Sequence, residues 1–282
     1  MSVVASWSER SPVLGLPRTE GRAELSFKRR GAVTAVDRFY QSGALRLRRP
    51  RREPGEAPEV VVLNTAGGLT GGDKLTLNLR WAAGTVATVS GQAAERVYRS
   101  LSGVAAVSTT IDVESDASAE WLPQETILFD GAALQRALSI SLAPGARFLG
   151  VETLVFGRTA RGERLQQGRL RDAWRLWRDG RLIFAEAIDL DGALGPALER
   201  PAAAPGLAAV ALAVLAAADA ESRLPALREA LARCTGLAAA SAWNGLLVAR
   251  FAACDSAVLR DDLLPVLTLL RDGRGPPRVW RC

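Results

Sequence analysis

Alternation of apolar and polar residues with a period of two dominates residues 22–190. Arg22–Lys28 and Lys74–Trp81 alternate in this way, and Val107–Val113 is rich in β-branched residues. Such patterns predict half-buried β-strands. Asp179–Gly180 separates two apolar runs and favours a tight hairpin turn. No repeat of fixed period accompanies the strands, so the pattern alone does not predict a solenoid.

The chain changes character after residue 190, where prolines punctuate an alanine-rich connection. Leucines at helical spacing then predict two helices. The first is expected over 222–233 with Ser222 as its N-cap. The second is expected over 255–272, capped by one of its first two residues, and Pro265 should kink or split it.

Two short apolar runs, 207–217 and 245–252, fit either a strand or a buried helix. Their alternation with the predicted helices suggests a β-α-β-α order. No segment resembles a linker long enough to separate two domains. We therefore predict one mainly β domain over residues 1–282, mostly β over 22–190 and mixed α and β over 205–275.

The chain contains no histidine, which excludes Ser-His-Asp hydrolases, His-ligated zinc and imidazole acid–base chemistry. Its three cysteines, Cys234, Cys254 and Cys282, are widely spaced, so they predict no paired-cysteine metal site and no disulfide framework. Free thiols fit a reducing cytoplasm. The first twenty residues lack a continuous apolar stretch, and no apolar run approaches the roughly twenty residues that span a bilayer. We expect a cytoplasmic protein without a membrane segment.

A glycine-rich segment, Gly67–Lys74, follows the apolar run Val60–Leu63. Gly67 and Gly72 have the spacing of a phosphate-binding loop, but Asp73 stands where such loops carry lysine. A carboxylate at that position would repel phosphate, and the strand pattern that follows offers no helix N-terminus. A nucleotide-dependent enzyme that uses this loop is therefore one alternative hypothesis. The simpler interpretation is a β connection whose glycines allow positive φ.

Residues 28–52 are rich in arginine, and the formal net charge of +6 favours acidic partners. An arginine-rich, nucleic-acid-binding β protein is thus a second alternative. Nucleic-acid binding needs a clustered basic face, whereas strand alternation places these arginines on both sides. The simpler interpretation is a solvated sheet edge that discourages strand-to-strand aggregation.

Three further segments concentrate polar residues. Ser90–Ser100 is either a solvated edge, with Glu95 paired to Arg99, or a surface for a partner or an ion. Glu120–Ala132 contains a proline that should break its strand, and Gly157–Glu163 is a glycine-rich turn that ends in a charge. Surface positions are the simplest interpretation of the acidic residues in these segments.

Taken together and in order, the segments resemble those of the urease accessory protein family UreD, also called UreH. The resemblance covers roughly residues 22–281 and is carried by Gly67–Asp73, Gln92–Ser100, Trp121–Ala132, Gly157–Glu163 and Pro277–Trp280. It implies a two-layered, β-helix-like arrangement of stacked sheets with two or more helices toward the C-terminus. It also implies a non-enzymatic scaffold or chaperone that binds apo-urease and the accessory proteins UreF and UreG, a GTPase, and helps nickel reach the urease active site.

Nickel in transit would need weak, exchangeable contacts, with no tightly bound cofactor. Nickel favours nitrogen and sulfur donors, but this chain has no imidazole, so carboxylates should line any path. We therefore predict transient nickel contacts at six acidic residues: Asp73, Glu95, Glu125, Asp130, Glu152 and Glu163. Three neighbouring residues are candidates for partner binding: Arg96, Tyr98 and Arg99. No catalytic residue is predicted.

Overall fold

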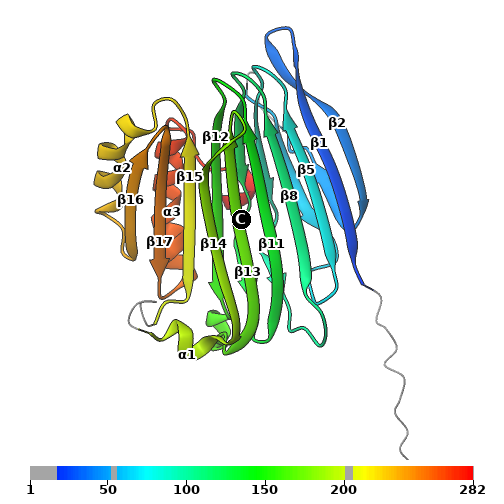
Figure 1. Cartoon of the computed structure of the whole chain (residues 1–282), viewed down its shortest axis with the longest axis vertical. Helices are drawn as coiled ribbons and strands as arrows, with labels where there is room; N and C mark the ends of the chain where they lie inside the picture. The colour runs from blue at the N-terminus through cyan, green and yellow to red at the C-terminus, as the bar shows by residue number, and fades with distance from the viewer. Residues whose placement is uncertain (1–17, 52–55, 201–205, 282) are drawn as a thin grey trace, which may run out of the picture.

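Two β-sheets lie face to face in the computed structural model, which describes residues 18–51, 56–200 and 206–281 (Figure 1). Arg52, Cys282 and the first seventeen residues, which entered the sequence predictions, lie outside the described residues. The first sheet has seven strands in the order β14-β13-β11-β8-β5-β1-β2. Their bounds are β1 Glu20–Arg30, β2 Val33–Gly43, β5 Lys74–Trp81, β8 Ala105–Val113, β11 Ala132–Leu142, β13 Gln167–Arg178 and β14 Arg181–Ala193.

The second sheet has ten strands, of which eight follow the order β16-β17-β15-β12-β9-β6-β4-β3. Of the remaining two, β10 pairs with β12, and β7 pairs with β10. The bounds are β3 Leu45–Arg48, β4 Glu59–Asn64, β6 Val86–Gly91, β7 Glu95–Val97, β9 Ser118–Leu122, β10 Thr126–Leu128, β12 Arg147–Phe156, β15 Ala209–Ala216, β16 Leu237–Trp243 and β17 Leu246–Ala253.

The chain winds between the two sheets as a solenoid does. It places β5, β8, β11 and β13 in the first sheet and β6, β9 and β12 in the second, and neighbouring strands of each set are parallel. The fold is therefore mainly β, with sheets stacked as a β-solenoid-like arrangement, as the resemblance implied. The coils begin at Lys74, Ala105, Ala132 and Gln167, so their lengths are unequal, which explains why the sequence shows no period.

Alternate residues of the strands fill the space between the sheets. In β5, Leu75, Leu77, Leu79 and Trp81 are buried, whereas the residues between them are exposed or half-buried. This is the period-two burial that the sequence predicted. The Trp81 indole N–H donates to the Ala87 carbonyl at 3.0 Å, so its polar group is satisfied inside the core.

The basic stretch forms edges of both sheets, because β2 ends the first sheet and β3 ends the second. Arg38 on β2 donates from Nε to Glu24 on β1 at 2.8 Å, and Lys28 pairs with Asp37 across the same two strands. Charged side chains on an edge oppose pairing with another chain. The interpretation of this stretch as an edge is confirmed for the arginines on β2 and β3, whereas Lys28, Arg29 and Arg30 lie on β1, inside the first sheet.

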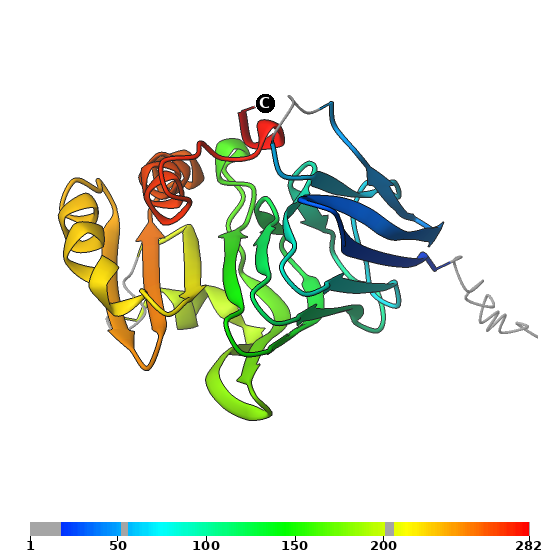
Figure 2. The same ribbon diagram turned by 90° about the horizontal axis from the view of Figure 1, so that it is seen from above.

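The C-terminal part extends the second sheet with the antiparallel strands β15, β17 and β16 (Figure 2). Both ambiguous apolar runs are strands, namely β15 and β17. The sequence did not predict β16, so the order is β-α-β-β-α. Four of its seven residues are alanine, which gives little contrast between its two faces.

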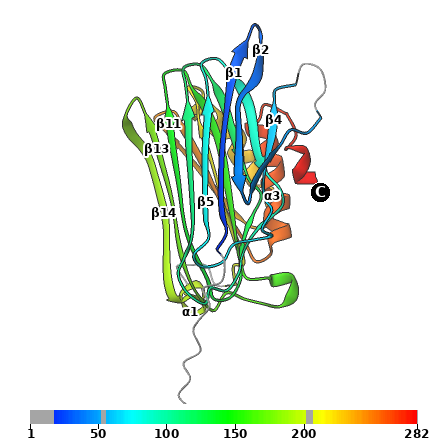
Figure 3. The ribbon, with the colours of Figure 1, turned by 90° about the vertical axis from the view of Figure 1, so that its right-hand side faces the viewer.

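Two helices, α2 (Leu224–Leu231) and α3 (Ser256–Leu270), pack on the outer side of these strands (Figures 2 and 3). Asp255 caps α3 as predicted, since its carboxylate accepts from the Ala257 N–H at 2.6 Å. Ser222 is not a helix cap, because it lies in a 3₁₀ turn ahead of α2. The predicted split at Pro265 is also wrong, since α3 continues through this exposed position.

Short helical segments complete the described chain: α1 Leu194–Leu198, η1 Thr159–Arg161, η3 Glu221–Arg223 and η4 Arg278–Arg281. No helix in this described part of the chain is long and apolar enough to cross a membrane.

The segment 271–281 lies against the middle of the second sheet. Arg271 donates from Nε and Nη2 to one carboxylate oxygen of Glu120 at 3.1 and 3.0 Å, and Arg274 reaches the other oxygen at 2.7 Å. The Trp280 indole donates to the Leu122 carbonyl at 3.0 Å. Only 3% of the Glu120 side chain is exposed, so these C-terminal residues neutralise a buried carboxylate more than 150 positions earlier.

Candidate functional site

The four polar segments identified in the sequence meet in space. The Tyr98 hydroxyl donates to the Gly67 carbonyl at 3.0 Å, which joins the second segment to the glycine-rich loop. Arg99 pairs with Asp130 at 2.8 Å, and the Asp130 N–H donates to the Glu163 carboxylate at 3.1 Å. These contacts join Ser90–Ser100 to Glu120–Ala132, and Glu120–Ala132 to Gly157–Glu163. Segments that are far apart in the chain form one continuous structure.

Strand β10 lies between β7 and β12, and the three strands run parallel. Glu95 is in register with Thr126, and Arg96 is in register with Ile127. Neighbouring side chains of a strand point to opposite faces. Glu95 therefore lines a cavity between the sheets, and Arg96, which also borders this cavity, lines a pocket on the outer side. One short strand contributes to two different sites.

The inner cavity has a volume of about 310 Å³ and lies between the two sheets. Its polar lining includes Asn64, Gln92, Glu95, Gln124, Arg136 and Glu152. The Asn64 amide donates to both carboxylate oxygens of Glu95, at 3.1 and 3.3 Å. The expected pairing of Glu95 with Arg99 is therefore wrong, because Arg99 lies beyond the end of β7 and pairs with Asp130.

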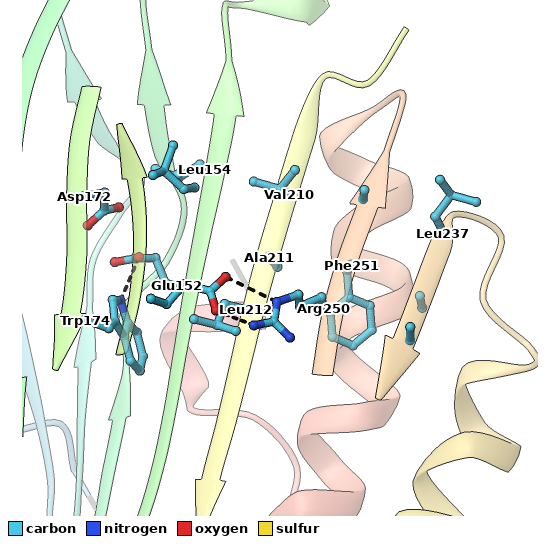
Figure 4. A pocket seen from close by; sticks show the side chains of 15 residues that line it. Glu152, Leu154, Asp172, Trp174, Val210, Ala211, Leu212, Leu237, Arg250 and Phe251 are labelled. Carbon is cyan, nitrogen blue, oxygen red and sulfur yellow. Dashed lines mark hydrogen bonds and ion pairs between the residues drawn. The ribbon is translucent and has the colours of Figure 1, made fainter. Parts of the chain in front are cut away.

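Arg136, on β11, is the centre of a charged network inside the molecule. Its guanidinium contacts Glu152 at 2.7 Å, donates from Nε to Asp172 at 3.1 Å, and donates to the Thr126 hydroxyl at 2.9 Å. The second oxygen of Glu152 accepts from the Trp174 indole at 2.8 Å (Figure 4). The network joins β11 and β13 of the first sheet to β10 and β12 of the second.

The sequence analysis identified Glu152 and missed Arg136 and Asp172. A signal was present, because both residues occupy positions that the period-two pattern assigns to the core. Asp172 falls between the buried residues Leu170 and Trp174 on β13. A charged residue at a core position of a strand is costly unless it is paired, so it indicates a buried site.

Three carboxyl groups near one guanidinium leave this site with an excess of acid. Burial raises the pKa of Glu95 to about 7, and the Asn64 hydrogen bond opposes the rise only in part. Burial also raises the pKa of Glu152 well above its usual value, against the attraction of Arg136 and with the help of the nearby Asp172 charge. Near neutral pH these groups can exchange a proton for another cation.

A lateral cleft of about 490 Å³ lies between the β13–β14 hairpin and the C-terminal strands β15, β17 and β16 (Figure 4). Its lining is mostly apolar, with Glu152 and Asp172 at its inner side. Arg250 on β17 donates from Nε to Glu186 on β14 at 3.2 Å and so joins the two walls. Glu152 lines both this cleft and the inner cavity, and it therefore stands between them.

Asp73 is buried in the glycine-rich loop, with 3% of its surface exposed. Its two carboxylate oxygens accept from the N–H groups of Thr19 and Thr70 at 2.7 and 2.8 Å. The carboxylate thus occupies the Thr70 amide and places a negative charge in the loop, and β5 rather than a helix follows the loop. These contacts match the sequence argument against a nucleotide site.

The remaining acidic candidates lie away from the inner cavity. Asp130 accepts from the N–H groups of Gln166 and Gln167, both at 2.9 Å; the Gln167 amide, with that of Gln166, holds the pKa of Asp130 below its usual value. Glu163 is paired with Arg158 in the same group of loops, and Glu125 lies near α3, 3.8 Å from Arg260. Of the six candidates, the cavity brings together only Glu95 and Glu152.

Within the described ranges, no three cysteine, aspartate or glutamate side chains form a group that could hold a metal ion.

The candidate partner-binding residues Arg96 and Tyr98 border an outer pocket of about 400 Å³. We call it the arginine pocket, and its lining includes Arg96, Tyr98, Phe129, Arg158 and Arg161. Arg99 is not among its lining residues and instead forms the ion pair with Asp130.

The fold and the site define a class of protein: a two-sheet, solenoid-like chain with ionisable groups buried between its layers. The family model described as UreD urease accessory protein matches residues 19–281. The chain is 46% identical to the urease accessory protein UreD of Methylobacterium sp. (strain 4-46) over 282 residues, which cover 98% of this chain and 97% of that relative. It is 42% identical to the urease accessory protein UreD of Azorhizobium caulinodans over 269 residues, which cover 94% and 98%. The chain therefore belongs to the UreD family of urease accessory proteins.

Proposed function

We propose that this chain is a cytoplasmic, non-enzymatic urease maturation factor. It is a scaffold that binds apo-urease together with UreF and the GTPase UreG, and it helps deliver nickel to the urease active site. Membership of the UreD family supports the role in urease maturation. The observation that carries the nickel step is the inner cavity, in which Glu95 and Glu152 lie near the guanidinium of Arg136, itself paired with Asp172.

Nickel is the cargo in this proposal. A hydrated divalent ion that reaches the cavity displaces the protons that Glu95 and Glu152 hold in part near neutral pH, because burial raises the pKa of both carboxyls. Carboxylate oxygens are poor ligands for nickel compared with imidazole or thiolate, so the ion exchanges rather than stays. Arg136 holds Glu152 in position and offsets part of the negative charge, which prevents tight retention.

The ion can pass at Glu152 from the inner cavity to the lateral cleft, since this residue lines both spaces. Asp172 and Glu186 supply further carboxylates in the cleft. The proposed path thus runs from Glu95 past Arg136 to the cleft between β14 and β17.

The test is urease activity measured against nickel concentration with Glu95→Gln and Glu152→Gln. Glutamine keeps the shape and an acceptor oxygen but removes the charge. Both variants should assemble with urease and yield about tenfold less active urease at limiting nickel, and excess nickel should partly restore activity by mass action. The matched control is Glu229→Gln, whose side chain is 74% exposed on α2. Full activity at every nickel concentration would remove both residues from the path.

Glu163→Gln and Glu125→Gln separate transit from loop support. Glu163 holds the Arg158 side chain and the Asp130 N–H, so its replacement should weaken complex formation, which added nickel cannot restore. A pull-down with apo-urease measures this loss directly. If Glu163→Gln or Glu125→Gln instead assembles fully and is rescued by nickel, that residue joins the path.

A further inference from the structure

We infer that the arginine pocket binds an acidic segment of a partner protein. The inference rests on the proposed function in one respect, namely that the partner belongs to the urease assembly. The pocket lies on the outer side of β7 and β10, opposite the inner cavity. A segment bound there would contact the protein without entering the nickel path.

The floor of the pocket is held in place by stacked side chains. The Arg158 guanidinium lies 4.4 Å from the centre of the Phe129 ring, and Phe129 meets Tyr98 edge to face at 4.9 Å. The Tyr98 hydroxyl is bound to the Gly67 carbonyl, and Arg158 is paired with Glu163. A site whose side chains are already fixed loses little conformational entropy when a ligand binds.

The charge in the pocket is not balanced from within. Arg96 and Arg161 are exposed, and neither has a carboxylate within ion-pair distance in the described part of the chain. The nearby acids are already engaged: Glu163 with Arg158, and Asp130 with Arg99. Each free guanidinium presents five N–H donors in a geometry that matches a carboxylate. Two carboxylates are the complementary ligand.

The pocket continues beneath α3, which favours an extended ligand over a small anion. Val155 and Ser256, the first residue of α3, border both the arginine pocket and a second cavity of about 220 Å³. Thr153 lines this second cavity, and its buried hydroxyl has no hydrogen-bond partner. A peptide can place carboxylates on the arginines and reach this hydroxyl with a polar group, whereas phosphate is too small to do both.

A nucleotide fits the pocket less well than a peptide does. Arg158 covers one face of Phe129 and Tyr98 occupies its edge, so this ring offers a base little room to stack. The glycine-rich loop that borders Tyr98 has its Thr70 amide bound to the Asp73 carboxylate, which would repel a phosphate. The remaining lining supplies guanidinium groups and apolar surface from Ile127, which suit glutamate or aspartate beside an apolar residue.

The test compares the full chain with Arg96→Gln/Arg161→Gln in binding to apo-urease and to each accessory protein by interferometry. The double variant should bind one of these partners at least about tenfold more weakly, because charge-assisted hydrogen bonds are lost. The control Arg171→Gln, at an exposed position of β13 on the opposite sheet, should bind as the parent does. Arg96 and Arg161 are both exposed, so replacing them leaves the core unchanged. Circular dichroism checks the fold of the double variant. Parent-like affinity of the double variant for every partner would overturn the inference.

A second measurement separates the pocket from the proposed function. A fluorescein-labelled peptide of glutamate and leucine, and its glutamine counterpart, are titrated at low salt and followed by fluorescence anisotropy. If the parent chain binds neither apo-urease nor an accessory protein, the proposed function fails. The peptide titration then tests the arginine pocket by itself. Preferential binding of the glutamate peptide to the parent over the double variant supports the inference. Equal binding to both, or competition by inorganic phosphate without any effect on partner affinity, overturns it.

Discussion

Glu95→Gln should stabilise this protein at pH 8 and have little effect at pH 5. Glu95 is held between the sheets with a pKa of about 7, against an ordinary value of 4.5. Between the ordinary and the raised pKa of Glu95, the folded state binds more protons than the unfolded state, so the free energy of unfolding falls as pH rises. Glutamine stays neutral throughout and keeps an oxygen that accepts from the Asn64 amide. The variant therefore avoids the cost of ionising a buried group.

The size of the stabilisation follows from the shift in the pKa of Glu95. A rise from 4.5 to about 7 corresponds to about 3 kcal/mol of folding free energy, present below the ordinary pKa and lost above the raised one. Glu95→Gln should accordingly exceed the parent by up to about 3 kcal/mol at pH 8 and by a small fraction of this at pH 5. The same substitution is expected to impair nickel transit, so stability and function should change in opposite directions.

Urea unfolding followed by tryptophan fluorescence at both pH values measures the difference. Glu229→Gln is the control, because this exposed residue should change stability by less than about 0.5 kcal/mol at either pH. Equal stability of Glu95→Gln and the parent at pH 8 would refute the argument. So would a stabilisation of the same size at pH 5, since it would point to packing rather than to the charge.

Arg136→Met should destabilise the chain by about 3–5 kcal/mol at pH 8, because it leaves Glu152 and Asp172 buried without their counter-charge. The loss should shrink at pH 5, because Glu152, whose pKa burial raises, takes up a proton there, and urea unfolding that shows the same loss at both pH values would count against this network. The isolated chain should neither bind nor hydrolyse GTP, because the Asp73 carboxylate lies in the loop and accepts from the Thr70 amide, where a phosphate would be repelled. Calorimetry checks this, and micromolar binding that disappears in Gly72→Arg would contradict it.

Much of the fold was predictable because it depends on local patterns. Alternation in β5 gave its buried face, and Asp179–Gly180 gave the turn of the β13–β14 hairpin, where both residues have positive φ. The solenoid could not be derived in this way, since its coils differ in length and only the family resemblance supplied it. Strand β16 was missed because alanine carries little hydrophobic contrast.

The site was predictable in part. Motif membership selected Glu95 and Glu152, but it also selected Asp73, whose carboxylate is bound by backbone amides and holds a loop. Sequence could not show that Arg136 on β11 faces Glu152 on β12, because that contact depends on how the two sheets are aligned across the core. Long-range alignment of this kind leaves no trace in the spacing of residues along one chain.

The contact between Glu120 and the arginines at 271 and 274 has a consequence during synthesis. Translation proceeds at about 5–20 residues per second, so Arg271 and Arg274 are synthesised roughly 8–30 seconds after Glu120. Until then the Glu120 carboxylate and the Leu122 carbonyl, which Trp280 later covers, remain open to water. A nascent or truncated chain that lacks residues 271–281 thus leaves the outer face of β9, beside Gln124, uncovered.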